Sequence, residues 1–106
     1  MNTILNQFGL SQRDMEEILG ILKSQTEVKI VHLFGSRAKG TFHSGSDVDL
    51  AIMNVGVSES TKRKLVEQFR ESALPYEVDL VDYTQLAHIP FKEHIERVGK
   101  KLFERI

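Results

Sequence analysis

Apolar residues recur at helical spacing in three segments of the chain. The first helix is expected from residue 11 to residue 25, and Ser11 with Asp14 three positions later has the form of a capping box at its start. Ser58 can cap a second helix, which should end before Pro75. Pro90 suits the first turn of a third helix. The buried stripe expected on this last helix consists of Phe91, Ile95, Val98 and Leu102.

Three short runs rich in β-branched residues predict strands. They cover residues 28–34, 47–53 and 76–82. Between the first two strands, segment 35–46 contains three glycines and several small polar residues, which predicts a loop with room for one helical turn after Ser36. The order of elements predicts an α/β (α+β) fold, in which a small mixed sheet carries helices mainly on one face. The other face would then be open to a substrate.

The length of 106 residues suits a single domain over the whole chain, with residues 1–10 as an N-terminal extension. A core of this size is modest, so a second chain, as a homodimer or a hetero-oligomer, is expected to complete a substrate site. Phe8, Leu10 and Phe103 lie near the two ends of the sequence. They form either an exposed apolar patch for such an association or an ordinary part of the core.

Charge and cysteine content exclude several classes of function. The 14 Lys and Arg residues against 15 Asp and Glu residues give a net charge of −1, so direct binding of duplex DNA is not expected. The sequence has no cysteine, which excludes a disulfide framework, a thiolate zinc site and a cysteine nucleophile. No segment resembles a signal peptide or a membrane span, and a reducing cytoplasm is the expected location.

Three aspartates predict a metal site on the sheet. Because strand side chains alternate, Asp47 and Asp49 must point to the same side, about 7 Å apart. Two carboxylates that close repel each other, and Mg²⁺ resolves the repulsion by binding one or two carboxylates together with phosphate oxygens. Asp79 on the next strand can supply a third carboxylate for a two-metal arrangement. Asp82 has the opposite parity and is left out of the predicted site.

A glycine-rich turn precedes the aspartates and predicts phosphate binding. Gly35 permits close approach of the backbone to a phosphate, and Ser36 adds a hydroxyl and an N–H group at the start of the helical turn. Arg37 and Lys39 carry charges that can screen a triphosphate, although a basic residue in a loop is as often only solvated. The three aspartates, by contrast, are more simply explained by catalysis than as solvated strand residues.

These residues resemble a known signature. The segment GSRAKGTFHSGSDVDLAI, residues 35–52, is similar to the Gly-Ser, spacer and Asp-x-Asp motif of nucleotidyltransferases of the DNA polymerase β superfamily. PYEVDLVD, residues 75–82, resembles the segment that supplies the third carboxylate in the minimal nucleotidyltransferases, or MNT proteins, of that superfamily. The resemblance extends from about residue 12 to residue 106, and no motif position departs from the pattern.

The resemblance implies a polymerase β-like palm and an enzyme that moves a nucleoside monophosphate, expected to be AMP from ATP. It implies that Asp47 and Asp49 bind two Mg²⁺ ions and that Asp79 binds the catalytic ion and assists deprotonation of the acceptor. Gly35 and Ser36 would hold the β and γ phosphates. Similar MNT proteins are antitoxins paired with an all-helical HEPN toxin, and a tyrosine of the toxin is the expected acceptor.

Two other functions remain open at this point. The chain is alternatively a binding antitoxin, which neutralises its partner by forming a complex with little or no transfer. A further alternative is a transferase for a small hydroxylated molecule such as an aminoglycoside, although the sequence provides no evident pocket for a polycationic sugar.

Overall fold

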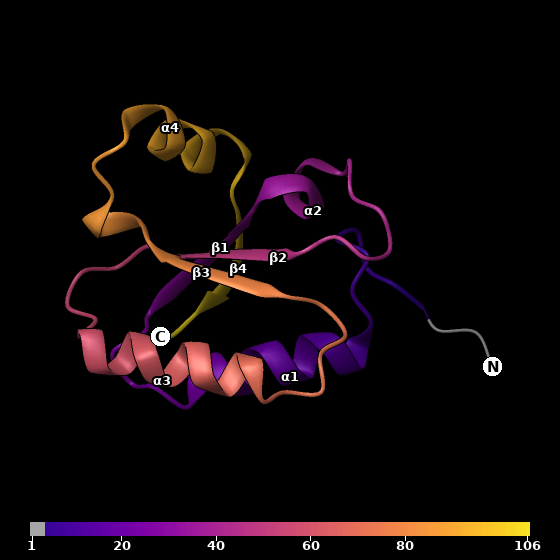
Figure 1. The fold of residues 1–106 in the computed structure, drawn as a ribbon, viewed down its shortest axis with the longest axis horizontal. Helices are drawn as coiled ribbons and strands as arrows, with labels where there is room; N and C mark the ends of the chain where they lie inside the picture. Colours follow the sequence, from indigo (N-terminus) through magenta and orange to yellow (C-terminus); the bar gives the residue numbers. More distant parts are fainter. Residues whose placement is uncertain (1–3) are drawn as a thin grey trace.

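The computed structural model describes residues 4–106, and its sheet contains four strands in the order β3-β2-β1-β4 (Figure 1). In chain order the elements are α1 (Gln12–Lys23), β1 (Ile30–Phe34), α2 (Gly35–Lys39), β2 (Val48–Ile52), α3 (Glu59–Arg70), β3 (Val78–Asp82), the 3₁₀-helix η1 (Tyr83–Gln85), α4 (Ile89–Val98) and β4 (Lys100–Glu104). β1 pairs antiparallel with β2 and β4, whereas β2 pairs parallel with β3. The sheet is therefore mixed, as the sequence predicts.

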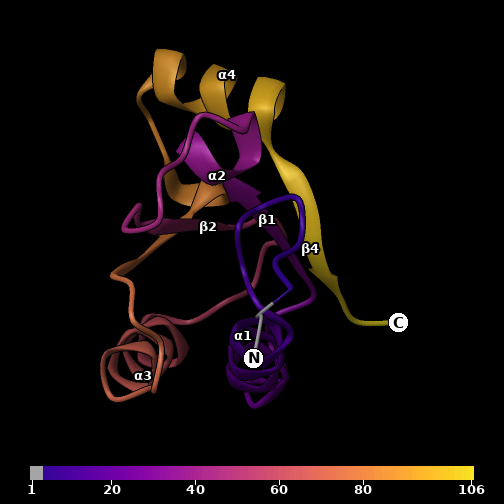
Figure 2. The same cartoon turned by 90° about the vertical axis from the view of Figure 1, so that its right-hand side faces the viewer.

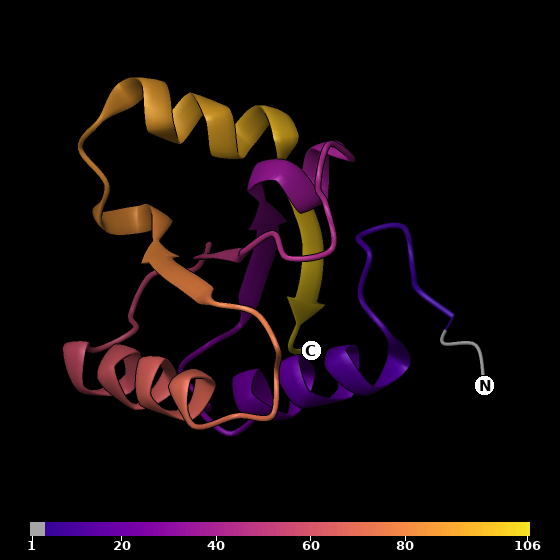
Figure 3. The same ribbon diagram turned by 45° about the vertical axis from the view of Figure 1, so that its right-hand side comes forward.

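The parallel pair requires a crossover, which α3 provides. α1 and α3 lie side by side on one face of the sheet (Figures 1 and 3). Their apolar stripes pack against the strand residues of matching parity, which bury the main core. From β2 this core receives Val48, Leu50 and Ile52, the three residues predicted to share a face. The same parity sends the neighbouring aspartates to the opposite face.

The opposite face is only partly open. Figure 2 shows α2 and α4 on the side of the sheet away from α1 and α3. Ile95 of α4 packs there with Phe34 and Ala51 in a second, smaller apolar cluster. The predicted fold class is confirmed, with the difference that α4 covers part of the face expected to be free. The uncovered part of that face lies over the ends of β2 and β3 where the aspartates are placed.

The C-terminal segment differs from the prediction. The last helix was expected to include Leu102, but it ends at Val98, and residues 100–104 form β4 beside β1. The prediction was wrong because the apolar spacing of the helix happens to continue past Gly99. The backbone at Gly99 lies so close to α4 that a Cβ there would be 2.5 Å from the carbonyl oxygen of Ile95. Only glycine permits this sharp exit into the strand.

Local signals set the helix ends as expected. Ser11 and Asp14 form the complete capping box of α1, and the hydroxyl of Ser58 accepts the N–H of Thr61 at the start of α3. The one helical turn predicted after β1 is α2, and it begins one residue earlier, at Gly35.

The segment before α1 belongs to the core. Phe8 and Leu10 are buried together with Phe103 of β4, so the structure supports core packing over the exposed apolar patch. Within residues 4–106, no helix is both long enough and apolar enough to cross a membrane.

Candidate active site

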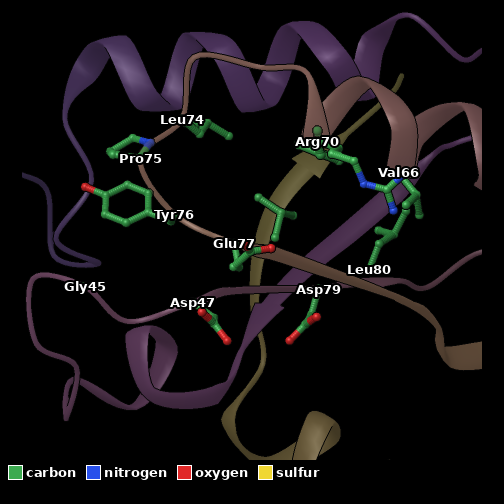
Figure 4. A pocket seen from close by; sticks show the side chains of 12 residues that line it. Gly45, Asp47, Val66, Arg70, Leu74, Pro75, Tyr76, Glu77, Asp79 and Leu80 are labelled. Atoms are coloured by element: carbon green, nitrogen blue, oxygen red, sulfur yellow. The ribbon is translucent and has the colours of Figure 1, made fainter.

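The three predicted aspartates come together on one face of the sheet. Asp49 of β2 and Asp79 of β3 are register partners in the parallel pair, and Asp47 immediately precedes β2. Figure 4 shows the carboxylates of Asp47 and Asp79 directed toward the same space from adjacent chain segments. Parallel pairing keeps the side chains of Asp49 and Asp79 on one side, and the charge of Asp47 reaches Asp49, so the three carboxyl groups form a cluster.

In the absence of a cation, the cluster disfavours the ionised form of Asp49. Partial burial, followed by the negative charges of Asp79 and Asp47, raises the pKa of Asp49 to about 6. A hydrogen bond with Asp79 also raises the pKa. The arrangement therefore favours either a shared proton or a bound cation between Asp49 and its neighbours.

The donor set fits a hard divalent cation that also binds phosphate. Among residues 4–106, no group of three or more His, Asp or Glu side chains is arranged so that it could hold a metal ion. Mg²⁺ does not need three protein ligands, since it usually binds one or two carboxylates and completes an octahedron with water and substrate oxygens. Asp47 and Asp79 are exposed and Asp49 is half-buried, so one or two of these carboxyl groups are accessible to a cation that arrives with a nucleotide.

Gly35 lies directly against this cluster. Its φ of +73° is unfavourable for other residues, and a Cβ at this position would overlap the carboxylate of Asp49. The backbone therefore passes the carboxylate at a distance that only glycine permits. Phe34, at the N-cap of α2, provides no side-chain cap, so the first N–H groups of this turn have no acceptor from the N-cap side chain.

Ser36 follows Gly35 in the first turn of α2 and is half-buried. Its carbonyl oxygen accepts the N–H groups of Gly40 and Thr41, which closes the short helix. The structure thus places Gly35, Ser36 and the three aspartates in one region, at the junction of β1, α2 and β2.

Arg37 does not fit the predicted contact with phosphate. Its side chain is 1% exposed, and its guanidinium carbon lies 4.3 Å from the ring centroid of Tyr76 and 5.3 Å from that of Phe42. The guanidinium donates hydrogen bonds of 2.8–3.3 Å to the carbonyl oxygens of Phe8, Gly9, Ser44 and Ser46. All of its nitrogens are thus engaged in holding the backbone around the site.

Lys39 occupies the last turn of α2 and is exposed. Gly35 starts this helix beside Asp49, so Lys39 lies about 6 Å further along the helix axis, at the rise of 1.5 Å per residue. Its side chain is exposed to solvent near the site.

Asp82 has a structural role on the other face of the sheet. It is buried, and it accepts hydrogen bonds from Lys62 of α3 at 3.2 Å and from the hydroxyl of Thr84 at 2.6 Å. Its exclusion from the site on the basis of strand parity agrees with this position.

Sequence reasoning missed a groove that adjoins the aspartates. A cavity of about 670 Å³ opens along the outer edge of β3, and Asp47 and Asp79 form part of its lining (Figure 4). The rest of the lining comes from α3 and the segment before β3, including Val66, Phe69 and Leu74. The sequence carries no signal for this groove, because three separate segments create it.

Known proteins share this architecture and these motifs. Residues 16–106 match the family model described as polymerase beta, nucleotidyltransferase. The protein adenylyltransferase MntA of Shewanella oneidensis is 28% identical over 95 residues, which cover 89% of this chain and 68% of that protein. The probable protein adenylyltransferase MntA of Haemophilus influenzae is 34% identical over 97 residues, which cover 91% and 84%.

A solved structure extends the similarity to three dimensions. The crystal structure of a toxin-antitoxin with AMP-PNP contains a chain that superposes with a TM-score of 0.69 at 28% sequence identity, covering 87% of this chain and 74% of that one. The family match over residues 16–106 spans the carboxylates and the glycine turn described above. This chain therefore belongs to the polymerase β nucleotidyltransferase family, with the MntA protein adenylyltransferases among its relatives.

Proposed function

We propose that this chain transfers AMP from ATP to a side-chain hydroxyl of a partner protein, with Mg²⁺ as cofactor. The observation that carries the proposal is the cluster of Asp47, Asp49 and Asp79, in which burial and two neighbouring charges raise the pKa of Asp49 and the backbone of Gly35 passes directly beside its carboxylate. Such a site gains most from a cation that is bound together with a triphosphate. Relatives named protein adenylyltransferase support the choice of donor and of acceptor class.

The proposed role of each residue follows from its position in the site. Asp47 and Asp49 would hold two Mg²⁺ ions, and Asp79 would complete the ligands of the ion nearest the acceptor. Bound there, Mg²⁺ would neutralise phosphate charge and lower the pKa of the acceptor hydroxyl. The first N–H groups of α2, from Gly35 and Ser36, would orient the β and γ phosphates, with the mobile charge of Lys39 nearby.

The reaction is a displacement at the α phosphorus of ATP. The acceptor oxygen forms a bond to this phosphorus while the bond to the bridging oxygen of pyrophosphate breaks. Asp79 would accept the hydroxyl proton, and pyrophosphate would carry the remaining negative charge away. The acceptor protein is left with a phosphodiester-linked AMP.

We further propose that the acceptor is a tyrosine of an HEPN-domain toxin and that the chain acts in the cytoplasm as its antitoxin in a hetero-oligomer. The resemblance of the motifs to MNT antitoxins supports this partner, and so does the toxin-antitoxin structure with AMP-PNP. AMP on the toxin would add charge and bulk, which can block an active site near the modified tyrosine.

Co-expression with the protein encoded by the neighbouring gene tests the proposal. The intact partner is weighed by mass spectrometry beside a control that carries Asp47→Asn and Asp49→Asn. A gain of whole AMP units on the partner, absent in the control, is the expected result. A stable complex without any gain of mass would refute transfer and leave neutralisation by binding.

A further inference from the structure

The outer edge of β3 has unpaired backbone groups beside the aspartate cluster. β3 is the first strand of the sheet, so only β2 pairs with it among the described residues 4–106. The N–H of Val48 donates to the carbonyl oxygen of Glu77 at 2.9 Å. In a parallel ladder this bond directs Glu77 and Asp79 toward β2, whereas Val78 and Leu80 direct their N–H and C=O groups outward.

These outward groups form the floor of the groove described above, and α3 forms its wall. Val66, on the face of α3 that borders the groove, is 40% exposed, so an apolar side chain is left at the surface there. Val78 and Leu80 line the same groove. Arg70 and Glu77 also line the groove, so Val66 is an apolar contact within a largely polar lining. The unpaired backbone of an edge strand is the feature that binds an extended peptide by adding a strand.

We propose that the edge of β3 binds a segment of the acceptor protein that lies outside its helices and is extended, so that it pairs with β3 as a fifth strand and presents its hydroxyl to Asp79. The inference rests on the proposed function for the identity of the occupant, and it deepens that function by locating the acceptor. The inference is supported by the position of the groove, because Asp47 and Asp79 line the same groove as the free edge of β3.

Strand geometry defines which segment can bind. Asp79 and Leu80 point to opposite faces of the sheet, and an added strand alternates in the same way. One set of its side chains therefore reaches the wall at Val66, and the other set reaches the carboxylates. Cross-strand neighbours lie about 5 Å apart at Cβ, which brings the acceptor side chain within reach of Asp79. The recognised pattern is a hydroxyl residue between two apolar or small residues.

Amide hydrogen exchange tests the pairing directly. The full chain is measured with and without the HEPN-domain partner protein, in the presence of AMP-PNP. We expect the amides of Val78 and Leu80 to exchange at least about tenfold more slowly in the complex, as paired strand amides do. The amide of Asp79, which faces β2, serves as the internal control and should change little.

A substitution that introduces a charge into the groove tests whether the groove binds the acceptor protein. Val66→Glu places a carboxylate against the acceptor segment, and Val55→Glu makes the same change at a valine that is 78% exposed and does not line the groove. We expect Val66→Glu to raise the KM for the partner protein by roughly tenfold, as a misfit in an apolar subsite does, with an unchanged KM for ATP. Val55→Glu should change neither value.

The outcomes separate this inference from the proposed function. Unchanged exchange at Val78 and Leu80 in a complex that transfers AMP would overturn the inference alone. Absence of transfer by the wild-type chain would refute the proposed function, while slower exchange and a dissociation constant raised by Val66→Glu would still establish the paired edge. Slow, concentration-dependent exchange in the free chain would show that a second copy occupies the edge and would overturn the inference. Lack of any complex would also overturn it.

Discussion

The guanidinium of Arg37 stacks on the ring of Tyr76, 4.3 Å from its centroid, and thereby joins α2 to the segment that leads into β3. The same group binds backbone carbonyls of the N-terminal segment and of the loop before β2. The phosphate turn and the strands that carry Asp49 and Asp79 are thus connected through one buried cation. Its role is to position the site rather than to contact the substrate.

Arg37→Lys should lower the free energy of unfolding by about 2 kcal/mol. An ammonium cannot reproduce the planar fork, so several buried carbonyl oxygens would lose their donors. Urea denaturation measures the loss, and Arg70→Lys, at an exposed arginine of α3, is the matched control with an expected change near zero. Equal stability of both variants would show that the stacked guanidinium contributes nothing specific.

Gly35→Ala should abolish binding of the Mg²⁺–nucleotide complex. The methyl group would overlap the carboxylate of Asp49, and the positive φ would add strain of about 1 kcal/mol. Gly56→Ala separates these effects, because Gly56 has a φ of +89° and open space around its Cβ position. Calorimetric titration should show normal binding by Gly56→Ala despite its lower stability. Normal binding by Gly35→Ala would contradict the contact.

Asp49→Asn should stabilise the protein in the presence of a chelator at neutral pH. Because the pKa of Asp49 is raised from 3.8 to about 6 in the folded state, its ionised form destabilises the fold, fully above about pH 6 and not at all below about pH 4. After allowance for solvent screening at this half-exposed group, we expect a gain of about 1 kcal/mol. Denaturation at several pH values measures it, and a gain that persists at about pH 4 would refute the assignment.

Binding of Mg²⁺ with nucleotide should weaken in acid for the same reason. A cation must displace the proton from Asp49, so affinity should fall by up to about tenfold per pH unit below about pH 6 and stay constant above it. Titration calorimetry over this range measures the profile. A flat profile through pH 6 would show that Asp49 is not a ligand.

Asp79→Asn should separate binding from transfer. Asp47 and Asp49 would still hold the Mg²⁺–nucleotide complex, whereas the group placed to accept the hydroxyl proton would be lost. We expect kcat to fall by about 10²–10⁴-fold with a KM for ATP within about threefold of the wild-type value. Quantitative mass spectrometry of the partner measures the rate. Full activity would exclude Asp79 from the proton transfer.

Much of the site follows from local rules, which is why it could be predicted. Alternation along a strand places Asp47 and Asp49 on one face, and the capping box of Ser11 and Asp14 marks the start of α1. Both depend only on neighbours in sequence. The sequence predicts glycine at position 35 for the close approach of a phosphate, which stays a prediction, and the structure gives the nearby carboxylate of Asp49 as a reason for glycine there.

The sequence by itself determined the fold class and the set of carboxylates, since backbone periodicity and motif spacing are local properties. Tertiary structure alone decided that residues 100–104 pair with β1, that Arg37 is buried against Tyr76, and that β3 lies at an open edge beside α3. Each of these depends on contacts between segments distant in sequence. The free energy of such contacts comes from burial and pairing partners that no local pattern specifies.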